Sequence, residues 1–180
     1  MPSPVPCLTS SLAANSVRVE NGASVLKPVL RYLAAVTLAN LAWELAQIPL
    51  YTIWREGSPG EILFAIGHCT LGDALIAAAS LELAIAVAGG RRWIDERSRV
   101  RRVAITTVVI AVVYTVFSEW WNVSIRGTWA YSDLMPIVSV LRSEVGLSPL
   151  LQWTVVPLLA FWMVRRHAEV STSQMRWSAR

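Results

Sequence analysis

Long apolar runs alternate with short charged segments along this chain. Four runs stand out, at about 29–53, 59–88, 103–123 and 147–164. A helix needs roughly 17–25 residues to cross the hydrocarbon core of a bilayer. The first three runs reach this length, and the fourth reaches it only when Gly146 and Leu147 are added to the apolar stretch from Pro149 to Val164. The pattern therefore predicts an all-α, polytopic membrane protein, built as a four-transmembrane-helix bundle.

Local residues mark some boundaries of these helices. Ser58-Pro59, with Glu61 three residues after the serine, is typical of a capped helix start, and Ser148-Pro149 resembles it. A long connection, 124–145, separates the third run from the fourth. Its apolar residues follow helical spacing, which predicts a short amphipathic interfacial helix on the membrane surface. These residues are Leu134, Ile137, Val138, Leu141 and Val145.

Composition supports the membrane interpretation. Hydrophobic residues make up 54% of the 180 residues and charged residues only 16%, whereas soluble domains carry about 25% charge. A disordered chain, a collagen-like chain and a disulfide-stapled secreted domain are excluded. The two cysteines, Cys7 and Cys69, form no CxxC pair, so chemistry by a vicinal dithiol is excluded as well.

Basic residues are distributed unevenly between the connecting segments. Thirteen of the 16 lie in the N-terminal flank, in the second loop around 91–102 or in the C-terminal tail. The positive-inside rule then predicts a multi-pass protein of a bacterial inner membrane with both termini in the cytoplasm. We divide the chain into a polar cytoplasmic arm (1–26), a transmembrane domain (27–166) and a basic cytoplasmic tail (167–180). Topology explains the basic residues better than nucleic-acid binding does, so the bilayer is the predicted partner.

Polar residues inside the spans are the candidates for function, because ionisable groups are costly there. Asn40, Glu44 and Gln47 follow helical spacing on one face of the first span. At the predicted orientation, each span places polar groups in its periplasmic half. We therefore expect a polar pocket open to the periplasm and covered by the stretch from Trp129 to Asp133. Its candidate residues are Asn40, Glu44, Gln47, His68, Asp73, Glu119, Asn122 and Gln152.

A metal or haem site is a weaker alternative for part of this set. His68 and Asp73 lie five residues apart, about 140° around a helix, so they cannot bind one metal from the same helix face. A shared site would need ligands from other helices, with Glu44 as a candidate. A single histidine is more often a hydrogen-bonded structural residue. The cofactor therefore stays undetermined.

Three function classes remain open. The first is an accessory, assembly or binding protein whose polar face contacts another membrane protein or a second copy of the chain. The second is a small intramembrane enzyme or metal-binding protein that uses Glu44, His68, Asp73 and Glu119. The third is an oligomeric transporter or channel subunit, for which four helices are few. No HExxH, GxSxG, Walker or CxxCH motif is present to decide between them.

Overall fold

The computed structural model describes residues 7–90, 93–140 and 143–178, and side chains between Leu26 and His167 within them. Predictions for 1–6, for Leu141 and for 179–180 lie outside the described residues. The longer helices are α1 (Cys7–Gln47), α3 (Pro59–Ala84), α4 (Arg97–Glu119) and α5 (Leu147–Ser178). The short elements are η1 (Ile48–Leu50), α2 (Ile53–Glu56), η2 (Ile85–Gly89), η3 (Trp120–Arg126), β1 (Ile137–Val140) and β2 (Ser143–Gly146).

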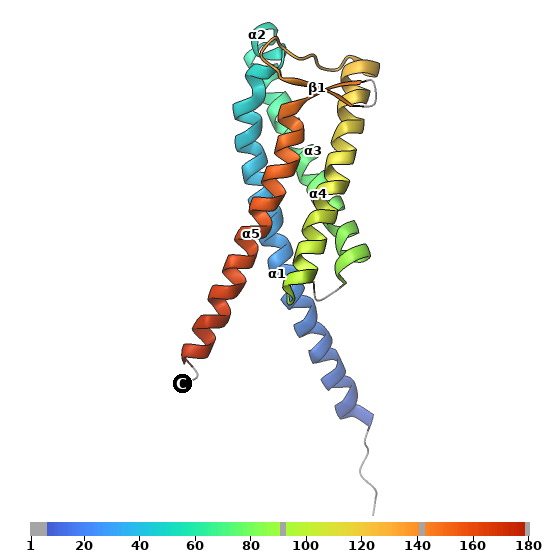
Figure 1. The fold of residues 1–180 in the computed structure, drawn as a ribbon. Coiled ribbons are helices and arrows are strands. Elements are labelled where there is room, and N and C mark those ends of the chain that lie inside the picture. Colours follow the sequence, from blue (N-terminus) through green and yellow to red (C-terminus); the bar gives the residue numbers. More distant parts are fainter. Residues whose placement is uncertain (1–6, 91–92, 141–142, 179–180) are drawn as a thin grey trace, which may run out of the picture.

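Within the described residues, four helical segments are long and apolar enough to span a membrane. They are Leu26–Leu50, Pro59–Gly89, Arg97–Arg126 and Leu147–His167. The helices pack side by side, with α3 and α5 each contacting both α1 and α4 (Figure 1). The predicted all-α, polytopic four-helix bundle is therefore confirmed.

The ends of α3 follow the local sequence. Ser58 accepts a hydrogen bond from the backbone N–H of Glu61, and the Glu61 side chain accepts one from the backbone N–H of Ser58. This reciprocal pair satisfies donors that the first helical turn leaves free. After η2 the chain turns at Gly90, which has a φ of 67°. Glycine adopts this left-handed region without the cost of a Cβ.

The prediction of an interfacial helix between the third and fourth spans is wrong. Its segment forms an antiparallel pair of strands, β1 and β2, in which Ile137 pairs with Gly146 and Val140 with Ser143. Pro136 comes just before β1, and three of the four residues of β1 are β-branched, which favours extended backbone over helix. Val145 is fully buried, so the small sheet packs onto the bundle.

The two ends of the bundle differ in chemistry. We call the end that carries β1 and β2 the sheet end, and the end that carries residues 93–96 the loop end (Figure 1). Apolar aromatic packing fills the loop end. The ring of Phe161 lies 4.6 Å from that of Tyr32 and 5.9 Å from that of Trp93. Polar side chains concentrate instead toward the sheet end.

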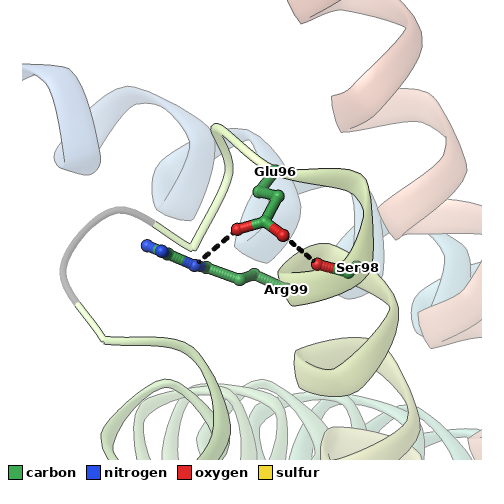
Figure 2. A network of polar contacts seen from close by, with 3 residues as sticks. All are labelled: Glu96, Ser98 and Arg99. Carbon is green, nitrogen blue, oxygen red and sulfur yellow. Dashed lines mark hydrogen bonds and ion pairs between the residues drawn. The ribbon is translucent and has the colours of Figure 1, made fainter.

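A small polar network marks the start of α4 at the loop end (Figure 2). Glu96 accepts a hydrogen bond from the Ser98 hydroxyl, and its carboxylate lies 2.9 Å from Nε of Arg99. The Ser98 bond, together with the charges of Arg99 and Arg102, holds the pKa of Glu96 below its ordinary value. Exposed pairs of this kind contribute little to stability, so the network orders the helix start locally.

Candidate functional site

A buried hydrogen-bonded cluster joins three helices near the sheet end. Gln152 of α5 donates to Glu44 of α1 at 3.1 Å and to Asp73 of α3 at 2.9 Å. Gln47 of α1 donates to Glu44 at 2.7 Å and to the Gln152 carbonyl oxygen at 3.2 Å. All four residues are at most 8% exposed. The carboxyl groups of Glu44 and Asp73 also contact each other, so two acidic groups share one desolvated space.

Two further side chains hold the cluster in place. The Ser148 hydroxyl donates to the Gln47 side-chain oxygen at 2.8 Å and accepts from the Trp43 indole N–H at 3.1 Å. The sequence predicted Ser148 at the start of the fourth helix. The helix begins at Leu147, and the Ser148 side chain links α5 to α1 instead. These contacts fix the rotation of both helices about their axes.

The third buried carboxyl has a different partner. Glu119 of α4 accepts a hydrogen bond from the Tyr131 hydroxyl, which itself accepts from the Gly146 backbone N–H at 2.9 Å. The sequence alone is compatible with an exposed interfacial carboxylate at Glu119 or with its pairing to Arg126. The residue is 6% exposed and is bound to Tyr131. The phenol thus connects a spanning helix to the sheet.

The segment 127–136, which we call the covering segment, passes over the sheet end of α1. The Thr52 N–H donates to the Ala130 carbonyl at 3.0 Å, and the Ser132 N–H donates to the Leu50 carbonyl at 2.9 Å. The rings of Tyr51 and Tyr131 lie 5.7 Å apart. Burial, and then the nearby Glu119 carboxyl, raise the pKa of both phenols. Both phenols therefore stay protonated at neutral pH.

A cavity of about 1180 Å³ lies under the covering segment. Side chains of α1, α3, α4 and α5 line it, together with Trp129 and Ala130 of the covering segment. Every predicted pocket residue except Asn40 belongs to this lining. Asn40 is fully buried one helical turn from Glu44, and neither polar atom of its amide has a hydrogen-bond partner among the described residues.

The cavity reaches the surface in two directions. Exposed residues at the sheet end, including Gly60 and Arg126, form part of its lining. Phe64 and His68 of α3 and Tyr114 of α4 also line it and are exposed within the spanning segments. A molecule can thus reach the cavity from the sheet end or from the side of the bundle.

The geometry offers little to a metal ion. In the described part of the chain, no three His, Cys, Asp or Glu side chains are placed to bind one. His68 is exposed, and its ring stacks on Phe64 with centroids 5.6 Å apart. The candidate ligands Glu44 and Asp73 accept hydrogen bonds from Gln152 instead. Chemically, the arrangement can bind a polar molecule or exchange protons with it.

Sequence reasoning missed two residues of this site. Tyr131 binds Glu119 although 12 residues separate them, and Ser148 binds Gln47 from 101 residues away. Tyr131 falls within the stretch from Trp129 to Asp133 that is predicted to cover the pocket, but nothing in that stretch indicates Glu119 as its partner. Ser148 was assigned to a helix cap, and nothing in its local sequence indicates a partner on another helix.

Comparison with known proteins gives no further guide to function, because no family model, curated protein or solved structure matches this chain.

Proposed function

We propose that this multi-pass membrane protein binds a small ligand in the cavity at its sheet end. The observation that carries the proposal is a buried polar wall to which four spanning helices contribute, through Glu44, Asp73, Glu119 and Gln152. Buried polar groups are costly inside a bilayer and tend to mark function. The volume of about 1180 Å³ is ample for a small molecule, because ligand pockets commonly measure about 300–1,000 Å³.

The proposal includes an orientation. We place the protein in a bacterial inner membrane, with both termini in the cytoplasm and the cavity open to the periplasm. The support is the distribution of basic residues, which are frequent at the loop end and in both terminal segments and sparse at the sheet end.

A second candidate is a small intramembrane enzyme acting on the bound molecule. The contact between the Glu44 and Asp73 carboxyl groups favours it, because adjacent carboxyls in a desolvated site are a common arrangement for general acid–base catalysis. If this candidate is correct, Asp73→Asn leaves ligand retention measurable and abolishes turnover of the retained compound. If the protein only binds the compound, both the wild type and Asp73→Asn release it chemically unchanged.

The binding proposal is tested by filling the cavity. Gly72 lies on α3 in the lining, and a Cβ added there meets nothing within 4 Å. Gly72→Phe therefore places a ring in the cavity without a backbone clash. Gly67 lies on the same helix outside the lining, is exposed and is equally open. Gly67→Phe is the matched control.

The purified wild type and both variants are incubated with a small-molecule extract of the source cells. Retained compounds are then identified by mass spectrometry. We expect at least one compound to be retained by the wild type and by Gly67→Phe. Gly72→Phe should not retain this compound. If all three proteins retain the same compounds in the same amounts, or none retains any, the cavity is not a ligand site.

A further inference from the structure

The hydrogen-bond donors of the buried cluster are already used. The Gln152 amide has two N–H groups, and they donate to Glu44 and Asp73. The two N–H groups of Gln47 donate to Glu44 and to the Gln152 oxygen. An amide has no third donor to offer. Neither glutamine therefore has an N–H left for a ligand.

The same accounting holds for polar groups elsewhere in the lining. The hydroxyl group of Tyr131, in the covering segment, donates its hydrogen bond to Glu119. The Thr115 hydroxyl donates to the Ala111 carbonyl at 2.9 Å. Asn122 directs its amide N–H groups to the backbone oxygen and hydroxyl of Ser118, at 2.9 and 3.3 Å. These three side chains use their donors within the protein, whereas the buried indole N–H of Trp129 in the lining has no hydrogen-bond partner among the described residues.

Acceptor capacity, by contrast, is left over. An ionised carboxylate has about four lone-pair sites, and a protonated carboxyl group keeps its remaining acceptor capacity beside one O–H donor. The hydrogen bonds above use Oε1 of Glu44, Oδ2 of Asp73 and Oε2 of Glu119. A molecule that enters the cavity thus meets acceptors in excess of donors. It binds well only if it brings N–H or O–H groups, because an unpaired acceptor in a desolvated site is costly.

The charge balance points the same way. Across residues 26–90, 93–140 and 143–167, no Arg, Lys or His side chain forms an ion pair with Glu44, Asp73 or Glu119. The basic side chains in the lining, Arg126 and His68, are both exposed. A buried carboxylate without a positive partner is unfavourable, so a cation in the cavity supplies what the chain does not.

The remaining walls are apolar and aromatic. Phe64 and Tyr114 line the side of the cavity that is exposed within the spans, and Trp153 lines it from α5. Aromatic faces attract ammonium groups and also pack against flat apolar bodies. The cavity thus combines acidic acceptors with aromatic surfaces.

From these observations, and on the basis of the proposed ligand-binding function, we propose that the cavity binds a protonated amine that carries an apolar or aromatic body. The ammonium N–H groups donate to the carboxylates of Glu44, Asp73 and Glu119. The apolar body lies against the aromatic walls toward the lateral opening.

Four probes that share one phenyl ring test this assignment on the purified full-length protein at pH 7. Benzylammonium has both charge and N–H donors, and benzyltrimethylammonium has charge without donors. Benzyl alcohol has a donor without charge, and benzoate has the opposite charge. Titration calorimetry gives their affinities. We expect benzylammonium to bind at least about tenfold more tightly than the other three, because only benzylammonium brings both a positive charge and N–H donors to the carboxylates.

Substitutions of cavity residues, with a matched control outside the cavity, test whether benzylammonium binds in the cavity. Asp73→Asn and Glu119→Gln remove charge, and each keeps an oxygen acceptor for its partner, Gln152 or Tyr131. Each is expected to weaken benzylammonium binding about tenfold and to leave benzyl alcohol unchanged. Glu144→Gln changes an exposed carboxylate of β2 outside the cavity and leaves every affinity unchanged.

The outcomes separate this assignment from the broader proposal. If benzyl alcohol, benzoate or benzyltrimethylammonium binds as tightly as benzylammonium, and Gly72→Phe blocks that binding, the cavity is a ligand site and the amine assignment is wrong. If benzylammonium does not bind while the retention experiment finds a cellular compound, the amine assignment is again wrong. Equal weakening by Glu144→Gln also overturns it, because the effect then arises outside the cavity.

Discussion

Replacement of Gln152 by leucine tests whether the buried cluster stabilises the bundle. Gln152 is 2% exposed, and its amide makes three hydrogen bonds that join α5 to α1 and α3. Leucine has a similar volume, so packing is largely preserved while all three bonds are lost. Measured side-chain hydrogen bonds between membrane helices average about 0.6 kcal/mol, with a maximum of about 1.7. The expected loss in unfolding free energy is therefore about 2–5 kcal/mol.

The assay is reversible unfolding in mixed micelles, with rising sodium dodecyl sulfate and helicity as the signal. Thr154→Val is the control, because Thr154 is exposed on the same helix and its hydroxyl bonds only within α5, to the Leu150 carbonyl at 2.8 Å. We expect the control to change the free energy by less than about 0.5 kcal/mol.

A double-mutant cycle checks that the loss comes from the network. Gln47→Leu is introduced alone and together with Gln152→Leu. Because the two amides bond to each other and to Glu44, we expect a coupling of about 0.5–2 kcal/mol. If Gln152→Leu is as stable as Thr154→Val, or if the effects of the two leucine substitutions are simply additive, the hydrogen-bonded cluster does not stabilise the bundle as a unit.

Three further outcomes follow from the structure. Gly89→Ala places a Cβ 2.5 Å from a side-chain carbon of Val103, so we expect a loss of about 1–3 kcal/mol in the same unfolding assay. Gly67→Ala meets open space and is the control. Burial and the Glu119 carboxyl raise the pKa of Tyr131 above its ordinary value of 10.0. The stability it contributes is therefore present below pH 10 and lost as the pH rises further. Wild type should lose more stability between pH 8 and pH 11 than Tyr131→Phe, and equal losses would contradict the assignment. Finally, a reporter active only in the periplasm should be active when fused after residue 57 or 130 and inactive after residue 96. The reverse pattern would invert the proposed orientation.

Much of the architecture could be predicted from local sequence. The four spans follow from the length of the apolar runs, because no shorter helix crosses a bilayer. The start of α3 follows from Ser58 and Glu61, whose reciprocal bonds involve only neighbouring residues. The inward face of α1 follows from the spacing of Glu44 and Gln47, since a polar stripe is excluded from lipid.

The secondary structure of the connection between α4 and α5 could not be predicted from local sequence. Apolar spacing at Leu134, Ile137 and Val138 fits a helix, and the β-branched residues around it fit a strand equally well. Pairing of β1 with β2, together with burial of Val145 against the bundle, decided the outcome. Tertiary contacts thus overrode a periodic pattern that was too short to be specific.

For the candidate site, the sequence alone indicated that the acidic and amide side chains of the spans face inward near one end of the bundle, because helical periodicity and the cost of polar groups in lipid act on each helix separately. Only the tertiary structure decided the partners. Gln152 donates a hydrogen bond to Asp73, 79 residues away in the sequence, and Tyr131 donates one to Glu119. Asn40 does not line the cavity. Each of these depends on the rotation and relative height of packed helices, which helical periodicity leaves free and side-chain packing fixes.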